Sequence, residues 1–205
     1  LRHQYFGEIR DYLPFRYVQP GPGESARGYP SDDTQLAFWT LEQLIEDDGL
    51  VPEHVARRFC RDHIFGMGSA VGGFVTAFQT GIEWRRAGQP SAGNGALMRI
   101  APILIPHLLR PSAELWVDTA LCAMITHNDT ASISACLAFV HILWELLHRE
   151  QPPDPSWWVR EYVTAAQDLE TERSYHPRGG IHGDYHGPVS RFVIEKVPPA
   201  YGRGL

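Results

Sequence analysis

The sequence predicts a single all-α domain. Apolar residues recur with a period near 3.6 in successive segments, which is the pattern of helices that bury one face. No window alternates convincingly between apolar and polar residues, so no half-buried strand is expected. The length of 205 residues suits one domain (1–205) with a well-buried core, and a hydrophobic fraction of 43% with 20% charged residues is ordinary for a globular protein.

The first third of the chain is expected to contain a loop and two helices. Residues 1–28 hold three prolines and several glycines with little periodicity, so they read mostly as loop. A helical apolar face covers residues 34–46, and the acidic turn at 47–49 ends it. The next helix begins at Pro52, because proline suits the first helical position, and its pattern places His63 in the core or at its edge.

Further helices are expected along the rest of the chain, each preceded by a break of glycine, proline or polar residues. They should lie over residues 71–78, after residue 95, and over residues 113–124, 131–148, 157–162 and 189–197. The segment 131–148 is the longest and most apolar, which predicts the core helix. Asp129 or Thr130 is placed to cap its first turn.

Charge and cysteine content exclude several classes of protein. The net charge of −6 gives no basic field for nucleic acid, so nucleic acid is not an expected partner. The three cysteines, Cys60, Cys122 and Cys136, are widely spaced on apolar helical patterns, which predicts reduced, buried thiols and neither disulfides nor a zinc site. No apolar run reaches about 18 residues, and no basic segment followed by an apolar one opens the chain. We therefore expect a cytoplasmic protein with no membrane partner.

An acidic cluster precedes the first predicted helix. Ser31, Asp32 and Asp33 stand immediately before its apolar face. Such residues commonly cap a helix N-terminus by accepting hydrogen bonds from its first backbone N–H groups. They are also the oxygen ligands that a hard divalent cation such as Mg²⁺ prefers. Both interpretations remain open on this segment alone.

Two glycine-rich segments stand before predicted helices. Gly66, Gly68 and Ser69 form the first, which is either a tight interhelical turn or an anion site, because glycine lets backbone N–H groups approach an anion closely. The second is Ser91-Ala92-Gly93-Asn94-Gly95-Ala96-Leu97-Met98-Arg99, in which Gly-Asn-Gly supplies positions that tolerate positive φ angles just before a helix, a shape suited to phosphate or ribose oxygens. Arg99 is expected to pair with a pyrophosphate or with a nearby acid.

Two later segments also carry polar groups. Thr126 to Asp129 bunch polar residues between two apolar helices, which makes a candidate binding turn. Residues 178–187 contain four glycines, two histidines and one acid. A zinc site there would lack a third well-spaced ligand, so a loop that covers the substrate is favoured.

Taken together, these motifs resemble the ADP-ribosylglycohydrolase family. Ser31-Asp32-Asp33-Thr34, the Gly66-x-Gly68 turn, Gly93-Asn94-Gly95-Ala96-Leu97-Met98-Arg99 and Thr126-His127 occur in the family's order and at roughly its spacing. The resemblance runs from about Arg10 to Tyr201. It implies an all-α orthogonal multi-helix bundle with a centre of two Mg²⁺ or Mn²⁺ ions.

The resemblance also implies a role for each matching residue. Ser31, Asp32 and Asp33 would be metal ligands, with the two aspartates as the catalytic residues. The substrate would be bound by Gly66, Gly68 and Ser69 at the phosphates, by Ser91, Gly93, Asn94, Gly95 and Met98 at the pyrophosphate and ribose, and by His127 beside the adenosine ribose. A metal-polarised water would then attack the anomeric carbon and release ADP-ribose from a protein side chain or small acceptor.

Two parts of the family pattern have no match in this sequence. They are a glycine-rich helix with a functional acid before the region matching Leu1, and an Asp-x-Asp-Thr motif after the region matching Leu205. We therefore expect the domain to be incomplete at both ends, as a piece of an active hydrolase. The alternatives are a degenerate member that binds ADP-ribose-like ligands or serves a structural role, and a helical interaction protein whose glycines and acids are only turns and caps.

Overall fold

The computed structural model describes residues 30–109, 112–176 and 183–198, so the loop predicted for residues 1–28 lies outside it. The predicted all-α class is confirmed for the described ranges. The α-helices are α1 (Asp32–Asp47), α2 (Pro52–Phe59), α3 (Ser69–Gln79), α4 (Trp84–Ala87), α5 (Glu114–Met124), α6 (Thr130–Leu147), α7 (Pro155–Ala166) and α8 (Val189–Lys196). Two 3₁₀ helices, η1 (Leu97–Arg99) and η2 (Ala101–His107), lie between α4 and α5.

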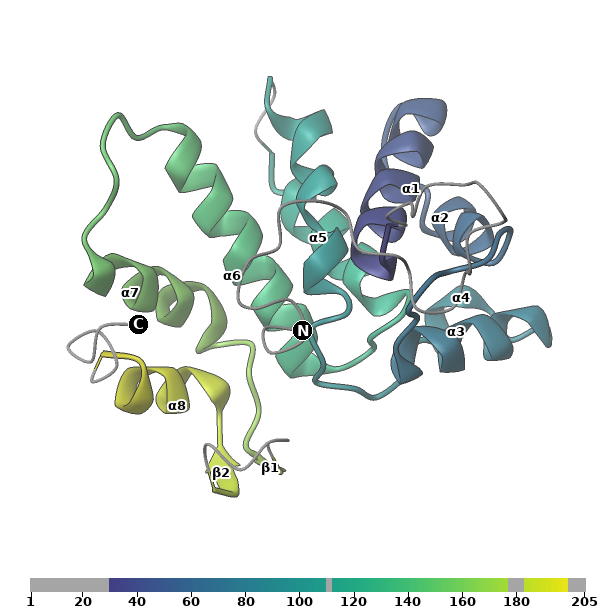
Figure 1. The fold of residues 1–205 in the computed structure, drawn as a ribbon. Coiled ribbons are helices and arrows are strands. Elements are labelled where there is room, and N and C mark those ends of the chain that lie inside the picture. The colour runs from purple at the N-terminus through teal and green to yellow at the C-terminus, as the bar shows by residue number, and fades with distance from the viewer. Residues whose placement is uncertain (1–29, 110–111, 177–182, 199–205) are drawn as a thin grey trace, which may run out of the picture.

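Figure 1 shows α6, α7 and α8 on one side of the molecule and α1 to α5 on the other. Helix α6 packs against α5 on one side and α7 on the other, and α8 packs against α7. Helix α1 packs against α2, η1 and η2. The segment after α4 therefore lies between α1 and α6, and this position brings residues 91–99 close to the start of both helices.

Helix α1 contributes to two apolar clusters. Leu44 packs in the first with Ile100, Leu104, Cys136 and Val140. Leu36 packs in the second, whose other members include Val55, Phe59, Val71, Phe74 and Ile125. Burying one leucine side chain contributes roughly 1.5 to 3 kcal/mol. Since α1 is anchored near both ends, the acidic residues at its first turn have a fixed position.

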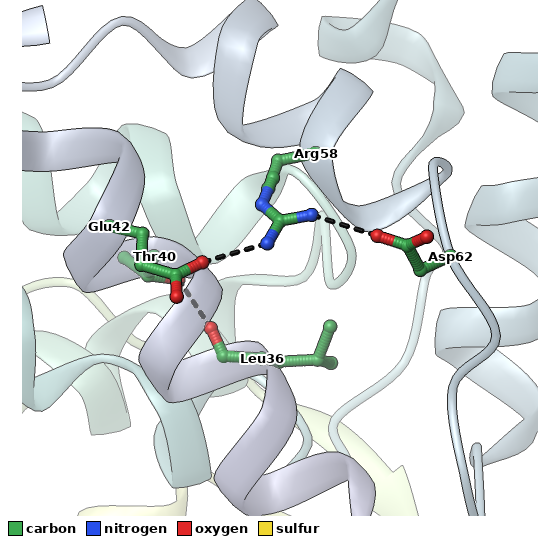
Figure 2. Close-up of polar contacts among 5 residues, drawn as sticks. All are labelled: Leu36, Thr40, Glu42, Arg58 and Asp62. Atoms are coloured by element: carbon green, nitrogen blue, oxygen red, sulfur yellow. Dashed lines mark hydrogen bonds and ion pairs between the residues drawn. The ribbon is translucent and has the colours of Figure 1, made fainter. Parts of the chain in front are cut away.

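Polar contacts hold α1 to α2 (Figure 2). The Arg58 guanidinium donates to Glu42 of α1 at 2.7 Å and to Asp62 at 2.9 Å, and it lies over the Trp39 ring at 5.0 Å. Inside α1, the Thr40 hydroxyl donates to the backbone oxygen of Leu36 at 2.8 Å and so has a partner although it is buried. Arg58 therefore joins the two helices at their partly exposed side.

Helix α6 is the core helix, as expected, and its cap is Asp129. The Asp129 carboxylate accepts the backbone N–H of Ala131 at 3.0 Å. Eight side chains of α6 are buried. By length and mean hydropathy α6 could also cross a membrane, which the count of consecutive apolar residues did not reveal. The core helix of a folded domain meets the same criterion.

Three local expectations were wrong. His63 is exposed, because α2 ends at Phe59 and the chain has left the helix before residue 63. The helix expected after Gly95 is made of 3₁₀ turns; Pro102 and Pro106 lack the N–H groups that an α-helix needs, and their rings hinder it. A short antiparallel pair, β1 (Arg173–Tyr175) and β2 (Tyr185–Gly187), was not expected, since three residues are too few to show an alternating pattern.

The cysteines agree with the prediction in part. Cys122 and Cys136 are buried and Cys60 is half-buried, and all three are free thiols. Burial raises the pKa of Cys60 to about 11 and that of Cys136 to about 12. These thiols therefore stay protonated at neutral pH, which disfavours metal binding or nucleophilic chemistry by them.

Candidate functional site

The structure brings most of the predicted site residues to one cavity of about 790 Å³. Its lining comes from the start of α1, the start of α3, the segment before η1, and single residues near α5 and β1. The lining residues are Asp32, Asp33, Gly68, Ser69, Ala70, Val71, Ser91, Ala92, Gly93, Asn94, Gly95, Met98, His127 and His176. Of the residues predicted to bind metal or substrate, Ser31 and Gly66 are next to the lining and not part of it.

The acidic cluster stands at the first turn of α1. Ser31 is the N-cap in extended backbone, yet its side chain makes no capping hydrogen bond. Its hydroxyl donates instead to the Asp33 carboxylate at 3.0 Å. The capping interpretation therefore fails for the Ser31 side chain. The Ser31 hydroxyl and the Asp33 carboxylate therefore lie together at the start of α1.

Asp32 lies in an environment that opposes its negative charge. Partial burial raises the pKa of Asp32, and the neighbouring charge of Asp33 raises it further, whereas the backbone N–H of Gly68 acts in the opposite direction. A cation between the two carboxylates would relieve this repulsion, so the oxygen donors present fit a hard divalent ion. Within the described ranges, no group of three or more His, Cys, Asp or Glu side chains could hold a metal ion. A metal ion bound there would therefore find only part of its coordination sphere among the described residues.

The turn before α3 is fixed against α1 by Gln35. Its side-chain amide donates to the backbone oxygen of His63 at 3.0 Å and accepts the backbone N–H of Phe65 at 2.7 Å. Gly66 then has a φ of 78°, which a residue with a side chain rarely adopts. A Cβ on Gly66 would lie 3.6 Å from a carboxylate oxygen of Asp32, so the turn passes close to the acidic pair.

The N-terminus of α3 faces the cavity. Gly68 is its N-cap, and apart from its chain neighbours no atom of the described residues lies within 4 Å of the place that a Cβ on Gly68 would take. Gly68 and Ser69 both line the cavity. The N–H of Gly68 interacts with Asp32, whereas the N–H groups of the first helical turn have no partner within the helix; together with the positive end of the helix dipole they make such a terminus suitable for an anion.

The second glycine segment is bound to the start of α6. The backbone N–H of Gly93 donates to the Ser91 hydroxyl at 3.2 Å, and the Ser132 hydroxyl of α6 donates to the backbone oxygen of Gly93 at 3.2 Å. Neither Gly93 nor Gly95 adopts the positive φ that glycine tolerates. Gly95 is required by space instead: a Cβ there would lie 2.6 Å from Cε1 of His127 and 2.9 Å from Nε2.

His127 lies at the end of α5 and contacts the glycine segment. It is 2% exposed, and a parallel bridge to Gln89 holds its backbone. Its Nδ1 lies 2.9 Å from the Thr126 hydroxyl. Burial lowers the pKa of His127, and the positive charge of Arg99 lowers it further, to about 4. His127 is therefore neutral at physiological pH.

Arg99 does not have the role expected for it. It is fully buried and lines no part of the cavity. Its guanidinium donates to the backbone oxygen of Cys122 at 2.9 Å and to the Thr126 hydroxyl at 2.8 Å, and it lies over the Phe59 ring at 4.9 Å. Among the described residues its hydrogen-bond partners are therefore Cys122 and Thr126 and not an acid, and because it is buried and lines no part of the cavity it is not placed to bind a pyrophosphate there.

His176 is a cavity residue that the sequence analysis missed. It follows β1, and its Nδ1 lies 3.0 Å from the Asp184 carboxylate, which stands just before β2. No periodicity or spacing singles it out, because the hairpin pairing of residues 173–175 with 185–187 brings it there. Asp184, the acid of residues 178–187, is not among the lining residues. His182 of the zinc alternative lies outside the described residues.

Comparisons with known proteins place the sequence in a family. The sequence model of the family described as ADP-ribosylglycohydrolase matches residues 1–197 of the chain. An uncharacterized protein of Archaeoglobus fulgidus is 31% identical over 140 residues, which are 66% of this chain and 44% of that protein. The chain therefore spans less than half the length of this relative.

Proposed function

The chain belongs to the ADP-ribosylglycohydrolase family, and from this premise we propose that its cavity binds the ADP-ribose group of an ADP-ribosylated protein or small acceptor. The reaction is hydrolysis of the N- or O-glycosidic bond between ADP-ribose and the acceptor. It produces free ADP-ribose and an unmodified acceptor side chain or molecule.

The observation that supports this proposal most is the meeting of two anion-binding segments and an acidic pair in one cavity. The terminus of α3 at Gly68 and Ser69 suits one phosphate, and residues 91–95 suit the other phosphate and a ribose. Asp32 and Asp33 lie at the same cavity. The volume of about 790 Å³ is within the range of roughly 300 to 1,000 Å³ that small-molecule sites occupy.

Mg²⁺ or Mn²⁺ is the proposed cofactor. Ser31, Asp32 and Asp33 would hold it at the start of α1, as oxygen ligands suited to a hard cation. When bound, the cation would hold ribose hydroxyls and make a water molecule more acidic. The chain's own contribution is to keep the two carboxylates together, with Ser31 oriented toward Asp33 and the Gly66 turn close to Asp32.

Binding without turnover is the second candidate. Within the described ranges, Asp32 and Asp33 are the only carboxylates that line the cavity, which is few for two divalent ions. A member that keeps the phosphate-binding segments and lacks the remaining ligands would bind ADP-ribose and leave its glycosidic bond intact.

The test is a calorimetric titration of the chain with ADP-ribose, with and without Mn²⁺, together with an assay for ADP-ribose released from an ADP-ribosylated protein. Asp32→Asn removes one metal ligand. Asp48→Asn is the matched control at the other end of α1, where residue 48 has a φ of 54° that asparagine tolerates.

The hydrolase proposal expects binding that Mn²⁺ strengthens, accompanied by turnover, in the wild type and in Asp48→Asn, with both lost in Asp32→Asn. Binding of ADP-ribose that does not depend on Mn²⁺, with no ADP-ribose released from the modified protein, would favour the second candidate, binding without turnover. A wild-type chain that binds no ADP-ribose would contradict both.

A further inference from the structure

A continuous chain of contacts runs from the core to the cavity. It begins at Arg99, whose guanidinium lies 2.8 Å from the Thr126 hydroxyl, and continues over 2.9 Å from that hydroxyl to Nδ1 of His127. Arg99 and Thr126 are fully buried, and His127 is nearly so. His127 is the member that lines the cavity.

The direction of each hydrogen bond in this chain follows from the chemistry of its groups. A guanidinium can only donate, so Arg99 gives a proton to the Thr126 oxygen. The hydroxyl of Thr126 has one proton of its own, and among the described residues its other hydrogen-bond neighbour is Nδ1 of His127. If Nδ1 also donated, that buried hydroxyl proton would have no acceptor, which is unfavourable for a buried polar group. Thr126 therefore donates and Nδ1 accepts.

This assignment fixes where the proton of His127 lies. A neutral imidazole carries one N–H, so with Nδ1 as acceptor the proton is on Nε2. Burial and the charge of Arg99 keep the ring neutral against the opposite influence of Asp129, since they lower the pKa of His127 to about 4. The described part of the chain offers Nε2 no hydrogen-bond partner, and Nε2 lies on the side of the ring that faces Gly95 and Gly93.

We propose that Arg99 and Thr126 are positioning residues, which hold His127 as the Nε2–H tautomer so that it donates a hydrogen bond to an oxygen of the bound ligand. Gly95 makes room for this ring, because any side chain there would meet it. The acceptor is a phosphate or ribose oxygen of an ADP-ribose group, and this last step rests on the proposed function. The tautomer itself does not depend on it.

The test is NMR of the full chain labelled with ¹⁵N-histidine, in which long-range proton–nitrogen correlations report which ring nitrogen carries the proton. Three proteins are compared: the wild type, Thr126→Val, which keeps the shape and removes the hydroxyl, and Thr126→Ser, which restores it. His127→Gln assigns the signal. Each protein is also titrated with ADP-ribose by calorimetry.

The proposal expects the Nε2–H pattern in the wild type and in Thr126→Ser, and a different or mixed pattern in Thr126→Val. It also expects the Nε2 signal to move when ADP-ribose binds, with affinity about tenfold lower in Thr126→Val, or roughly 1.4 kcal/mol, and restored in Thr126→Ser.

An Nδ1–H pattern in the wild type would overturn the proposal, as would an unchanged pattern in Thr126→Val. The wild-type spectrum decides the tautomer even if Thr126→Val fails to fold. ADP-ribose that binds without moving the Nε2 signal would overturn the donation to ligand. An Nε2–H pattern in a chain that binds no ADP-ribose would support the tautomer and contradict the proposed function.

Discussion

Replacing Gly95 by alanine is the most direct test of the contact between the glycine segment and His127. The added methyl group would lie 2.6 Å from Cε1 and 2.9 Å from Nε2 of the ring, closer than carbon atoms approach in proteins. Because Nδ1 is bonded to buried Thr126, the ring can move only by breaking that hydrogen bond. The substitution therefore forces His127 out of place.

The expected cost has two parts. Overpacking a well-filled site costs typically about 1 to 3 kcal/mol, and losing one hydrogen bond adds roughly 1 kcal/mol. Replacing glycine by alanine where the backbone allows it would otherwise stabilise a protein by about 0.4 to 1 kcal/mol. We expect Gly95→Ala to lower the free energy of unfolding by about 1 to 3 kcal/mol, a drop of roughly 2 to 12 °C in Tm at 2 to 4 °C per kcal/mol.

The assay is a double-mutant cycle in urea, with Gly95→Ala measured in the wild type and in His127→Ala. Removing the ring removes the collision, so in His127→Ala the same substitution should be neutral or stabilising. Gly72→Ala in α3 is the matched control. Its methyl group would meet only the Met67 side chain at 3.6 Å, and alanine favours a helix, so this variant should gain stability.

An equal cost of Gly95→Ala in both backgrounds would refute this reasoning, because the cost would then come from the backbone and not from His127. A loss of stability in Gly72→Ala would show that replacing glycine by alanine destabilises this chain even without a collision with a histidine ring.

Three further substitutions test the site. The pKa of His127 in the folded protein, about 4, is below the ordinary 6.5, so the unfolded chain takes up the proton at a higher pH than the folded one. The free energy of unfolding should therefore fall by up to roughly 3 kcal/mol as the pH drops from about 6.5 to 4. Urea titrations at several pH values should show a smaller fall in His127→Gln. The pKa of Asp32 is raised in the folded protein, so its ionisation lowers the free energy of unfolding as the pH rises above about 3.8, and Asp32→Asn should be more stable than the wild type at neutral pH. Added Mn²⁺ should raise the Tm of the wild type and leave that of Asp32→Asn unchanged. Equal Mn²⁺-induced shifts in Tm in both proteins would contradict a metal-binding role of Asp32. A lysine in place of Arg99 cannot reach both the Cys122 oxygen and Thr126, so Arg99→Lys should lower the free energy of unfolding by about 1.5 to 3 kcal/mol. An unchanged urea midpoint would show that these two hydrogen bonds of Arg99 do not stabilise the fold.

Much of the fold could be predicted from the sequence. The period of apolar residues is a local property, and it predicted helices at 34–46 and 131–148, where the structure has α1 and α6. It failed where local rules were overridden: the proline-containing segment 101–107 became 3₁₀ turns, and residues 173–175 found a strand partner ten residues further along the chain. Pairing of this kind depends on the path of the chain and leaves no pattern in three residues.

The sequence indicated several residues that line one cavity in the structure, but it did not indicate why each stands there. Glycine, hydroxyl and carboxylate residues before helices suggested Asp32, Gly68, Gly93 and Gly95, and the cavity contains all four. The reason given for Gly95 was that it tolerates a positive φ, whereas the structure requires space there for a histidine 32 positions later in the sequence. A single sequence cannot show which side chain will occupy that space.

The sequence alone determined which segments would be helical and which would carry oxygen donors and backbone N–H groups, because both follow from residue types at neighbouring positions. Only the tertiary structure decided how these groups act. It turned Arg99 inward, since burial beside Phe59, Cys122 and Thr126 supplies its partners, and it placed neutral His127 at the cavity. Those assignments depend on contacts between residues far apart in the chain, where distance and burial, not residue type, decide which hydrogen bonds form.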